Sequence, residues 1–180
     1  MVYLNNIDFS ILNYIYNTFS CNLLDMLMPL ITSLGNKGIV WIGVAILMLT
    51  HHNYRKNGLI LLAALAVGAL CTNVVLKNLF ARPRPCWIYP IELLIPMPTD
   101  YSFPSGHTTA SFISAVIIGY TEKRLGIAAF ILAFLISFSR LYLYVHFPSD
   151  VICGTIFGSL VGFIMYKYIY SLIEKNITYK

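Results

Sequence analysis

Six apolar runs recur along this 180-residue chain and constrain its fold more than any other feature. The chain is 58% hydrophobic and only 11% charged, a balance that soluble domains do not show. Two of the runs approach the roughly 18 to 20 residues that a helix needs to cross a bilayer, and neighbouring helices can accommodate shorter ones. We therefore expect an all-α, polytopic membrane helix bundle of about six transmembrane helices. The runs cover residues 23–34, 39–49, 59–76, 108–120, 125–138 and 151–170.

The first two runs are short and are joined by the sequence GNKG at residues 35–38. We expect either two short spans or a re-entrant hairpin, and both return the chain to its starting side. Ahead of them, apolar residues recur at helical spacing from Ile7 to Phe19, which predicts an N-terminal interfacial helix over residues 1–20. That segment lacks the basic start and the cleavage site of a signal peptide. Without linkers or repeats, the chain is expected to form one membrane domain over 1–180, with its helix bundle over 21–175.

The formal net charge of +5 would suggest nucleic acid as a partner of a soluble protein. In a membrane protein the distribution of basic residues between the two sides carries the information, and we expect no nucleic-acid partner. In a six-span topology seven of the 12 basic residues fall on one side: Arg55, Lys56, Lys123, Arg124, Lys167, Lys175 and Lys180. The other side holds Lys37, Lys77, Arg82, Arg84 and Arg140. The positive-inside rule then places the first group in the cytoplasm and the long loop after Lys77 outside the plasma membrane.

Three cationic side chains on the expected outer side, Lys77, Arg84 and Arg140, can surround a phosphate dianion. Backbone amides around Ser105 and Gly106, at the start of a helix, add further donors. A basic residue at a helix end also fits simple snorkelling to lipid headgroups, and that alternative applies to Arg140.

Two histidines in the same region, His107 and His146, supply a nucleophile and a separate proton donor. Asp150 follows His146 by four residues, a spacing that brings the carboxylate within reach of the ring at a helix start. Asp150 is also a good helix cap, which is compatible with that role. No acidic cluster suited to magnesium lies nearby, and the four cysteines show no CxxC spacing, so we expect no metal and no cofactor.

These residues fall into three motifs, and in them the sequence resembles the type 2 phosphatidic acid phosphatases. The family motifs are Lys-x6-Arg-Pro, Pro-Ser-Gly-His and Ser-Arg-x5-His-x3-Asp. Here they read KNLFARPRP at 77–85, PSGH at 104–107 and SRLYLYVHFPSD at 139–150. All specified residues match in order, and each motif stands at the end of an apolar run or in an outward loop.

The resemblance implies that His146 attacks phosphorus to form a phosphohistidine, that Asp150 orients it, and that His107 protonates the departing oxygen. It also implies a set of residues that hold the phosphoryl oxygens: Lys77, Arg84, Ser105, Gly106 and Arg140. Arg82-Pro83 is a second Arg-Pro pair. Arg84 is therefore chosen on the family spacing, and Arg82 is kept as a candidate auxiliary contact.

We expect an integral-membrane lipid phosphatase. An outward site favours a polyprenyl diphosphate such as undecaprenyl diphosphate, because glycan polymerisation releases that carrier lipid on the outer leaflet for recycling in cell-wall synthesis. Phosphatidylglycerophosphate and phosphatidic acid are the alternative substrates. In other classes, the alternatives are a vanadate-dependent haloperoxidase, against which the apolar runs argue, and a non-enzymatic lipid-binding or transport protein with a vestigial site, against which both intact histidines argue. The sequence does not indicate an oligomeric state.

Overall fold

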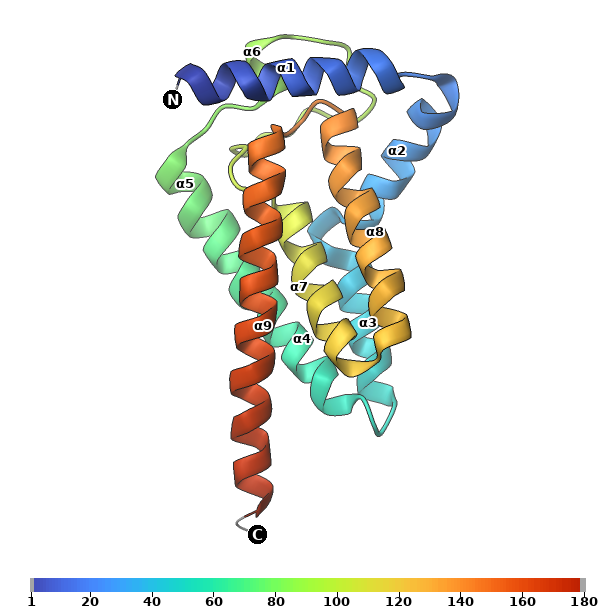
Figure 1. The fold of residues 1–180 in the computed structure, drawn as a ribbon, viewed down its shortest axis with the longest axis vertical. Coiled ribbons are helices and arrows are strands. Elements are labelled where there is room, and N and C mark those ends of the chain that lie inside the picture. Colours follow the sequence, from blue (N-terminus) through green and yellow to red (C-terminus); the bar gives the residue numbers. More distant parts are fainter. Residues whose placement is uncertain (1, 179–180) are drawn as a thin grey trace.

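The computed structural model describes residues 2–178, and these form helices and loops without a strand. The order along the chain is shown in Figure 1. The elements are α1 (Val2–Phe19), α2 (Asn22–Leu34), the 3-10 turn η1 (Asn36–Gly38), α3 (Ile39–Thr50), α4 (Arg55–Ala69), the π-helical segment η2 (Leu70–Leu76), α5 (Lys77–Phe80), α6 (Pro85–Ile88), α7 (Gly106–Thr121), α8 (Lys123–Tyr142) and α9 (Pro148–Thr178). The all-helical prediction is confirmed for this part of the chain.

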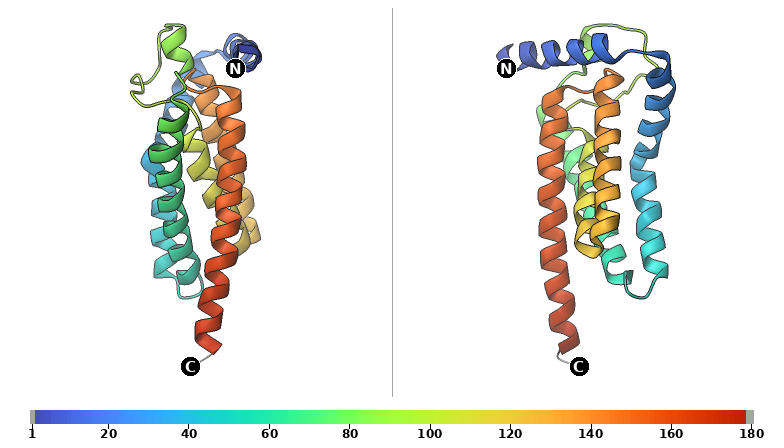
Figure 2. Two further views of the ribbon diagram at one scale, coloured as in Figure 1. Left: turned by 90° about the vertical axis from the view of Figure 1, so that its left-hand side faces the viewer. Right: turned by 45° about the vertical axis from the view of Figure 1, so that its right-hand side comes forward.

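The helices form an upright bundle with α7 at its centre, packed against α4, α8 and α9. Helix α1 lies across one end of this bundle, and α6 and the loop that follows it lie at the same end (Figures 1 and 2). We call it the α1 end, and we call the opposite end, with the turns at 51–54 and 122, the far end. The connection between α8 and α9, residues 143–147, also lies at the α1 end.

The first two apolar runs form α2 and α3, which follow one another from the α1 end to the far end with a bend of 45° (Figure 2). The expectation of two separate spans or a hairpin is wrong. Lys37 and Gly38 adopt left-handed backbone angles, with φ of 51° and 70°, and so break the helix without reversing the chain. Consequently the chain does not return to its starting side, and α4, which begins at Arg55, starts at the far end.

Three helical stretches in the described residues are long and apolar enough to cross a membrane: Arg55–Ile88, Lys123–Tyr142 and Pro148–Ser171. The bent pair of α2 and α3 raises the number to four if it counts as one span. Six spans are therefore not confirmed. The first two of the six apolar runs, α2 and α3, follow one another from one end of the bundle to the other. Helix α7 has only 16 residues.

The predicted N-terminal helix is present as α1, but its polar residues do not all face away from the protein. Ile7 and Ile11 are exposed, at 57% and 44%, whereas Asp8 and Leu12 are buried against the bundle. On an interfacial helix a charged residue such as Asp8 would ordinarily face water. The structure instead turns it toward the loops at the α1 end.

A row of glycines brings α9 close to α7. A Cβ atom on Gly154 or Gly158 would lie 2.9 Å or 2.5 Å from the backbone oxygens of Ser105 and Thr109, closer than a real Cβ contact allows. Small residues of this kind permit close helix contact inside membranes. The contact fixes the start of α7 against the start of α9, so the segments that carry the two predicted catalytic histidines are held together.

Candidate active site

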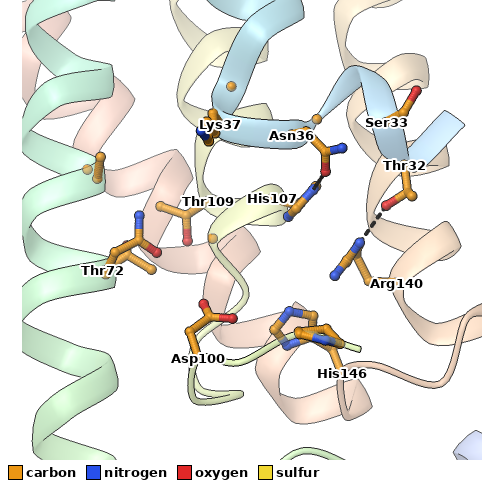
Figure 3. Close-up of a pocket in the computed structure, with 18 of the residues that line it drawn as sticks. Thr32, Ser33, Asn36, Lys37, Thr72, Asp100, His107, Thr109, Arg140 and His146 are labelled. Carbon is orange, nitrogen blue, oxygen red and sulfur yellow. Dashed lines mark hydrogen bonds between the residues drawn. The ribbon is translucent and has the colours of Figure 1, made fainter. Parts of the chain in front are cut away.

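A cavity of about 1040 Å³ joins the three motifs at the α1 end of the bundle (Figure 3). It is lined by six of the residues predicted from sequence: Lys77, Arg84, Gly106, His107, Arg140 and His146. They come from α5, the start of α6, the start of α7, the end of α8 and the loop after α8. The bundle therefore gathers residues that are up to 69 positions apart in the sequence.

His146 is buried, and its hydrogen bonds define its tautomer. The Nη1 atom of Arg84 lies 3.0 Å from Nε2 of the ring. Because a guanidinium only donates, Nε2 accepts and the ring proton is on Nδ1. Nδ1 faces Ser102 Oγ at 3.3 Å and Asp150 Oδ2 at 3.5 Å, and Ser102 also donates to Asp150 Oδ2. The ring thus presents an Nε2 lone pair beside Arg84, with the carboxylate behind it.

The surroundings of His146 keep its ring neutral. Burial, and after it the charges of Arg84, Arg140 and Lys77, lower the pKa of this histidine well below its ordinary value of 6.5. A neutral imidazole is the nucleophilic form, and in this structure its Nε2 lone pair accepts the hydrogen bond from Arg84 Nη1.

Two of the predicted phosphate-binding cations, Lys77 and Arg84, share the carboxylate of Asp100. Lys77 donates through Nζ, and Arg84 donates from Nη2 at 2.7 Å. Burial alone would raise the pKa of Asp100, but the bonds and charges of Lys77 and Arg84 lower it to about 2, so the carboxylate is ionised. This pair of cations therefore binds an oxyanion from the protein's own loop, and a phosphoryl group offers them the same kind of acceptor.

Arg140, the third cation, is buried near the end of α8. Its Nη1 donates to Thr32 Oγ of α2 at 2.6 Å (Figure 3). Its buried Nε has no hydrogen-bond partner within residues 2–178. A buried donor of this kind is rare in proteins and suits a site that receives an oxyanion.

His107 begins α7 and points toward the break between α2 and α3. Its Nε2 lies 3.0 Å from Oδ1 of Asn36 (Figure 3). An amide oxygen only accepts, so Nε2 carries a proton here. A Cβ atom on Gly35 would lie 2.6 Å from the imidazole Cδ2, which means that a side chain at this position would displace the ring. The GNKG sequence is thus part of the site as well as a helix break.

Ser105 and Gly106, which were expected to supply amides to a phosphoryl group, have different places. Gly106 lines the cavity. Ser105 is wholly buried, and its Oγ caps α7 by accepting from the Thr108 amide at 3.4 Å. The Ser105 amide donates to the Asp150 carbonyl at 3.2 Å. Its amide is therefore engaged between α7 and α9 rather than directed at the cavity.

Arg82, the candidate auxiliary contact in the sequence, does not line the cavity. Its Nη1 donates to Asp150 Oδ1 at 2.6 Å, its Nη2 donates to Asp8 Oδ2 at 2.7 Å, and its guanidinium lies 4.1 Å from the centre of the Phe147 ring. The arginines of the two Arg-Pro pairs therefore have different places in the structure. Arg84 borders the cavity, and Arg82 holds the carboxylate behind the histidine.

Four residues of this arrangement were missed in the sequence. Asp100 and Ser102 stand just before the PSGH motif, and an acid and a hydroxyl so near that motif were a usable signal. Asn36 lies in the GNKG break, and Asp8 lies in the N-terminal helix. No local pattern connects either of them with the motifs, because their partners are distant in sequence.

Comparison with known proteins shows to which family the chain belongs. A model of the PAP2 superfamily matches residues 57–174, which include all three motifs. The chain belongs to the PAP2 superfamily. This PAP2 protein is 38% identical to an undecaprenyl-diphosphatase of Sulfolobus acidocaldarius over 143 residues, which are 78% of this chain and 68% of the relative.

Two solved structures have the same fold. Aquifex aeolicus LpxE matches with a TM-score of 0.79 and 31% identity over 89% of this chain and 94% of the other. The transmembrane PAP2-type phosphatidylglycerolphosphate phosphatase of Bacillus subtilis matches with a TM-score of 0.78 and 25% identity over 95% and 88%. With its apolar helices, this PAP2 protein is therefore a membrane-embedded lipid phosphatase.

Proposed function

We propose that this PAP2 protein hydrolyses undecaprenyl diphosphate to undecaprenyl phosphate through a phosphohistidine at His146. One observation carries the proposal. His146, His107 and the three buried cations Lys77, Arg84 and Arg140 line one cavity at the end of an apolar bundle.

The proposed reaction has two steps. In the first, the Nε2 lone pair of His146 attacks the terminal phosphorus, the bond from phosphorus to the leaving oxygen breaks, and that oxygen takes the bonding electrons. His107 supplies a proton where the leaving group needs one. Ser102 and Asp150, which face the Nδ1 proton, stabilise the cationic ring. In the second step, water attacks the phosphorus, neutral His107 accepts the proton of that water, and the bond from phosphorus to Nε2 breaks with its electrons returning to the ring, so that phosphate leaves and His146 is neutral again.

The residues that line the cavity support a lipid diphosphate as the substrate class. Away from the cations, its walls are apolar and are built by residues such as Pro29, Ile42 and Leu65, which suits an isoprenoid chain. Lys37 lines the same cavity beside Asn36, on the side to which His107 points. The ammonium group of Lys37 forms no hydrogen bond or ion pair within the described part of the chain. A leaving group that carries its own phosphate would meet this cation beyond His107.

The likeness to the Sulfolobus acidocaldarius undecaprenyl-diphosphatase favours the same substrate. The likeness to the Bacillus subtilis phosphatidylglycerolphosphate phosphatase makes phosphatidylglycerophosphate the second candidate. That substrate leaves an alcohol oxygen at the cleaved bond, and its phosphodiester lies a glycerol unit farther from that bond than the phosphate of a diphosphate's leaving group.

A lipid panel tests this proposal. Purified protein in detergent micelles with excess EDTA should release phosphate, because the cations of the cavity are side chains and not metal ions. The value of kcat/KM should be about 10-fold or more higher for undecaprenyl diphosphate than for phosphatidylglycerophosphate or phosphatidic acid, a difference of ~1.4 kcal/mol. Absence of turnover on every lipid would contradict the enzyme, and activity that depends on magnesium would contradict the metal-free site.

We further propose one domain over 1–180 that crosses the plasma membrane five times, through α2–α3, α4–α5, α7, α8 and α9. Helix α7 has 16 residues, but α4, α8 and α9 surround it, so it meets little lipid. Four basic residues, Arg55, Lys56, Lys123 and Arg124, stand at the far end. The positive-inside rule then directs the active site away from the cytoplasm and puts α1 at the outer interface. Lys180 lies outside the described residues.

Thiol labelling of intact cells tests this orientation. Native Cys86 is buried and is unsuitable, so the probes are Met97→Cys, at an exposed site in the loop after α6, and Asn53→Cys, in the exposed far-end turn. Both are made with exposed Cys21 changed to Ser. A membrane-impermeant maleimide should label position 97 and should label position 53 only after the cells are permeabilised. The reverse pattern would contradict the orientation.

A further inference from the structure

Asp8 connects the N-terminal helix to the segment that carries the active-site carboxylate. Its side chain is buried, although α1 lies across the outside of the bundle. Oδ2 accepts from Arg82 Nη2 at 2.7 Å and from Ser149 Oγ at 2.5 Å, while Oδ1 accepts from the Ser149 amide at 2.9 Å. All three bonds therefore end on residues that adjoin Asp150 in space or in sequence.

Arg82 joins the two carboxylates. One of its terminal nitrogens binds Asp8, and the other binds Asp150 Oδ1 at 2.6 Å. The second oxygen of Asp150 is left for the nucleophile side, where it accepts from Ser102 and from the Phe147 amide at 2.9 Å and lies 3.5 Å from His146 Nδ1. The two oxygens of Asp150 thus have separate partners, and Arg82 fixes the rotation of the carboxylate.

The charges of this group matter because His146 becomes cationic when Nε2 bonds to phosphorus. Asp150 can stabilise that cation only with its negative charge directed at Nδ1. Arg82 alone would cancel this charge, since a carboxylate and a guanidinium sum to zero. With Asp8 included, two carboxylates and one guanidinium leave a net charge of −1 behind the ring.

We infer that Asp8 is a positioning residue for the nucleophile, which acts through Arg82 and Asp150 and makes the interfacial helix α1 part of the catalytic apparatus. This inference rests on the proposed role of His146. Asp8 itself touches neither the cavity nor the ring among the contacts of the described residues.

Asp8→Asn tests the inference, because it keeps the shape of the side chain and removes its charge. We expect kcat to fall about 10-fold or more with KM within about twofold of wild type, as for outer groups that orient a reacting histidine. Asp8→Glu should recover part of kcat. The matched control is Asn13→Leu, on the same helix, which removes the 2.6 Å bond from Tyr144 to Asn13 without affecting Asp150. It should retain kcat within about twofold of wild type.

A double-mutant cycle separates positioning from simple docking of α1. Asp8→Asn is measured in wild type and in Asp150→Asn, with p-nitrophenyl phosphate as a substrate whose leaving group is good enough to give measurable rates. If Asp8 acts through Asp150, Asp8→Asn should cause no further loss of kcat in the Asp150→Asn background. An equal loss in both backgrounds, an equal loss in Asn13→Leu, or no loss in Asp8→Asn would overturn the inference. If the proposed function itself is wrong, the result is different, because the His146→Ala variant would then be as active as wild type.

Discussion

His146→Ala should lose about 10⁴-fold or more in kcat on every lipid phosphate, whatever the leaving group, by analogy with other removed nucleophiles. The reason is that Nε2 of this ring forms the new bond to phosphorus in the proposed reaction. Single-turnover rates on undecaprenyl diphosphate and on phosphatidic acid measure the effect. His52→Ala, at an exposed position in the far-end turn, is the control and should leave both rates unchanged. A loss confined to one of the two lipids would contradict the nucleophilic role.

His107→Ala should affect the two lipids unequally. A general acid contributes about 10² to 10⁴-fold when the departing oxygen is a basic alkoxide, as with phosphatidic acid. A phosphate monoester, with a second pKa near ~6, can depart without that proton, so undecaprenyl diphosphate should lose much less. The measurement is the ratio of single-turnover rates of wild type and variant on each lipid.

Equal losses on both lipids, with chemistry shown to be rate-limiting, would contradict the acid role of His107. The residue would then act through phosphate binding. Asn36→Ala is a useful companion variant, since it removes the 3.0 Å contact that holds the ring while leaving the ring itself in place. It should reproduce the same inequality between the lipids with a smaller magnitude.

The gathering of the site could be predicted from sequence because each motif borders an apolar helix. Lys77 ends one apolar run, His107 begins the next, and Arg140 ends the one after that. Successive membrane helices reverse direction, so these positions meet at one end of the bundle. The motif spacing also selected Arg84 over Arg82, and the structure places only Arg84 at the cavity.

The path of α2 and α3 could not be predicted, because hydrophobic periodicity does not tell whether a break reverses the chain. The sequence GNKG is equally compatible with a tight turn. The backbone angles at Lys37 and Gly38 give a 45° bend instead, and this puts α1 at the same end as the active site.

The partners of the catalytic groups also could not be predicted from the sequence. Asp8 stands 142 positions before Asp150, and only the fold brings both to Arg82. A polar residue on an amphipathic helix is ordinarily solvated, so the helical spacing gives no sign that Asp8 is buried. Asp100 and Ser102 lie in a loop without regular structure, where no periodicity predicts the direction of a side chain.

The most direct test of the central claim is to trap the covalent intermediate. Purified protein is mixed with undecaprenyl diphosphate labelled with ³²P at the terminal phosphate, quenched within one turnover in alkali, in which phosphohistidine survives, and digested for mapping of the label. The phosphohistidine mechanism predicts a transient label on the peptide that contains His146, absent from His146→Ala and still formed in His107→Ala. Label on the His107 peptide, or no protein-bound label while the lipid is hydrolysed in the same turnover, would contradict it.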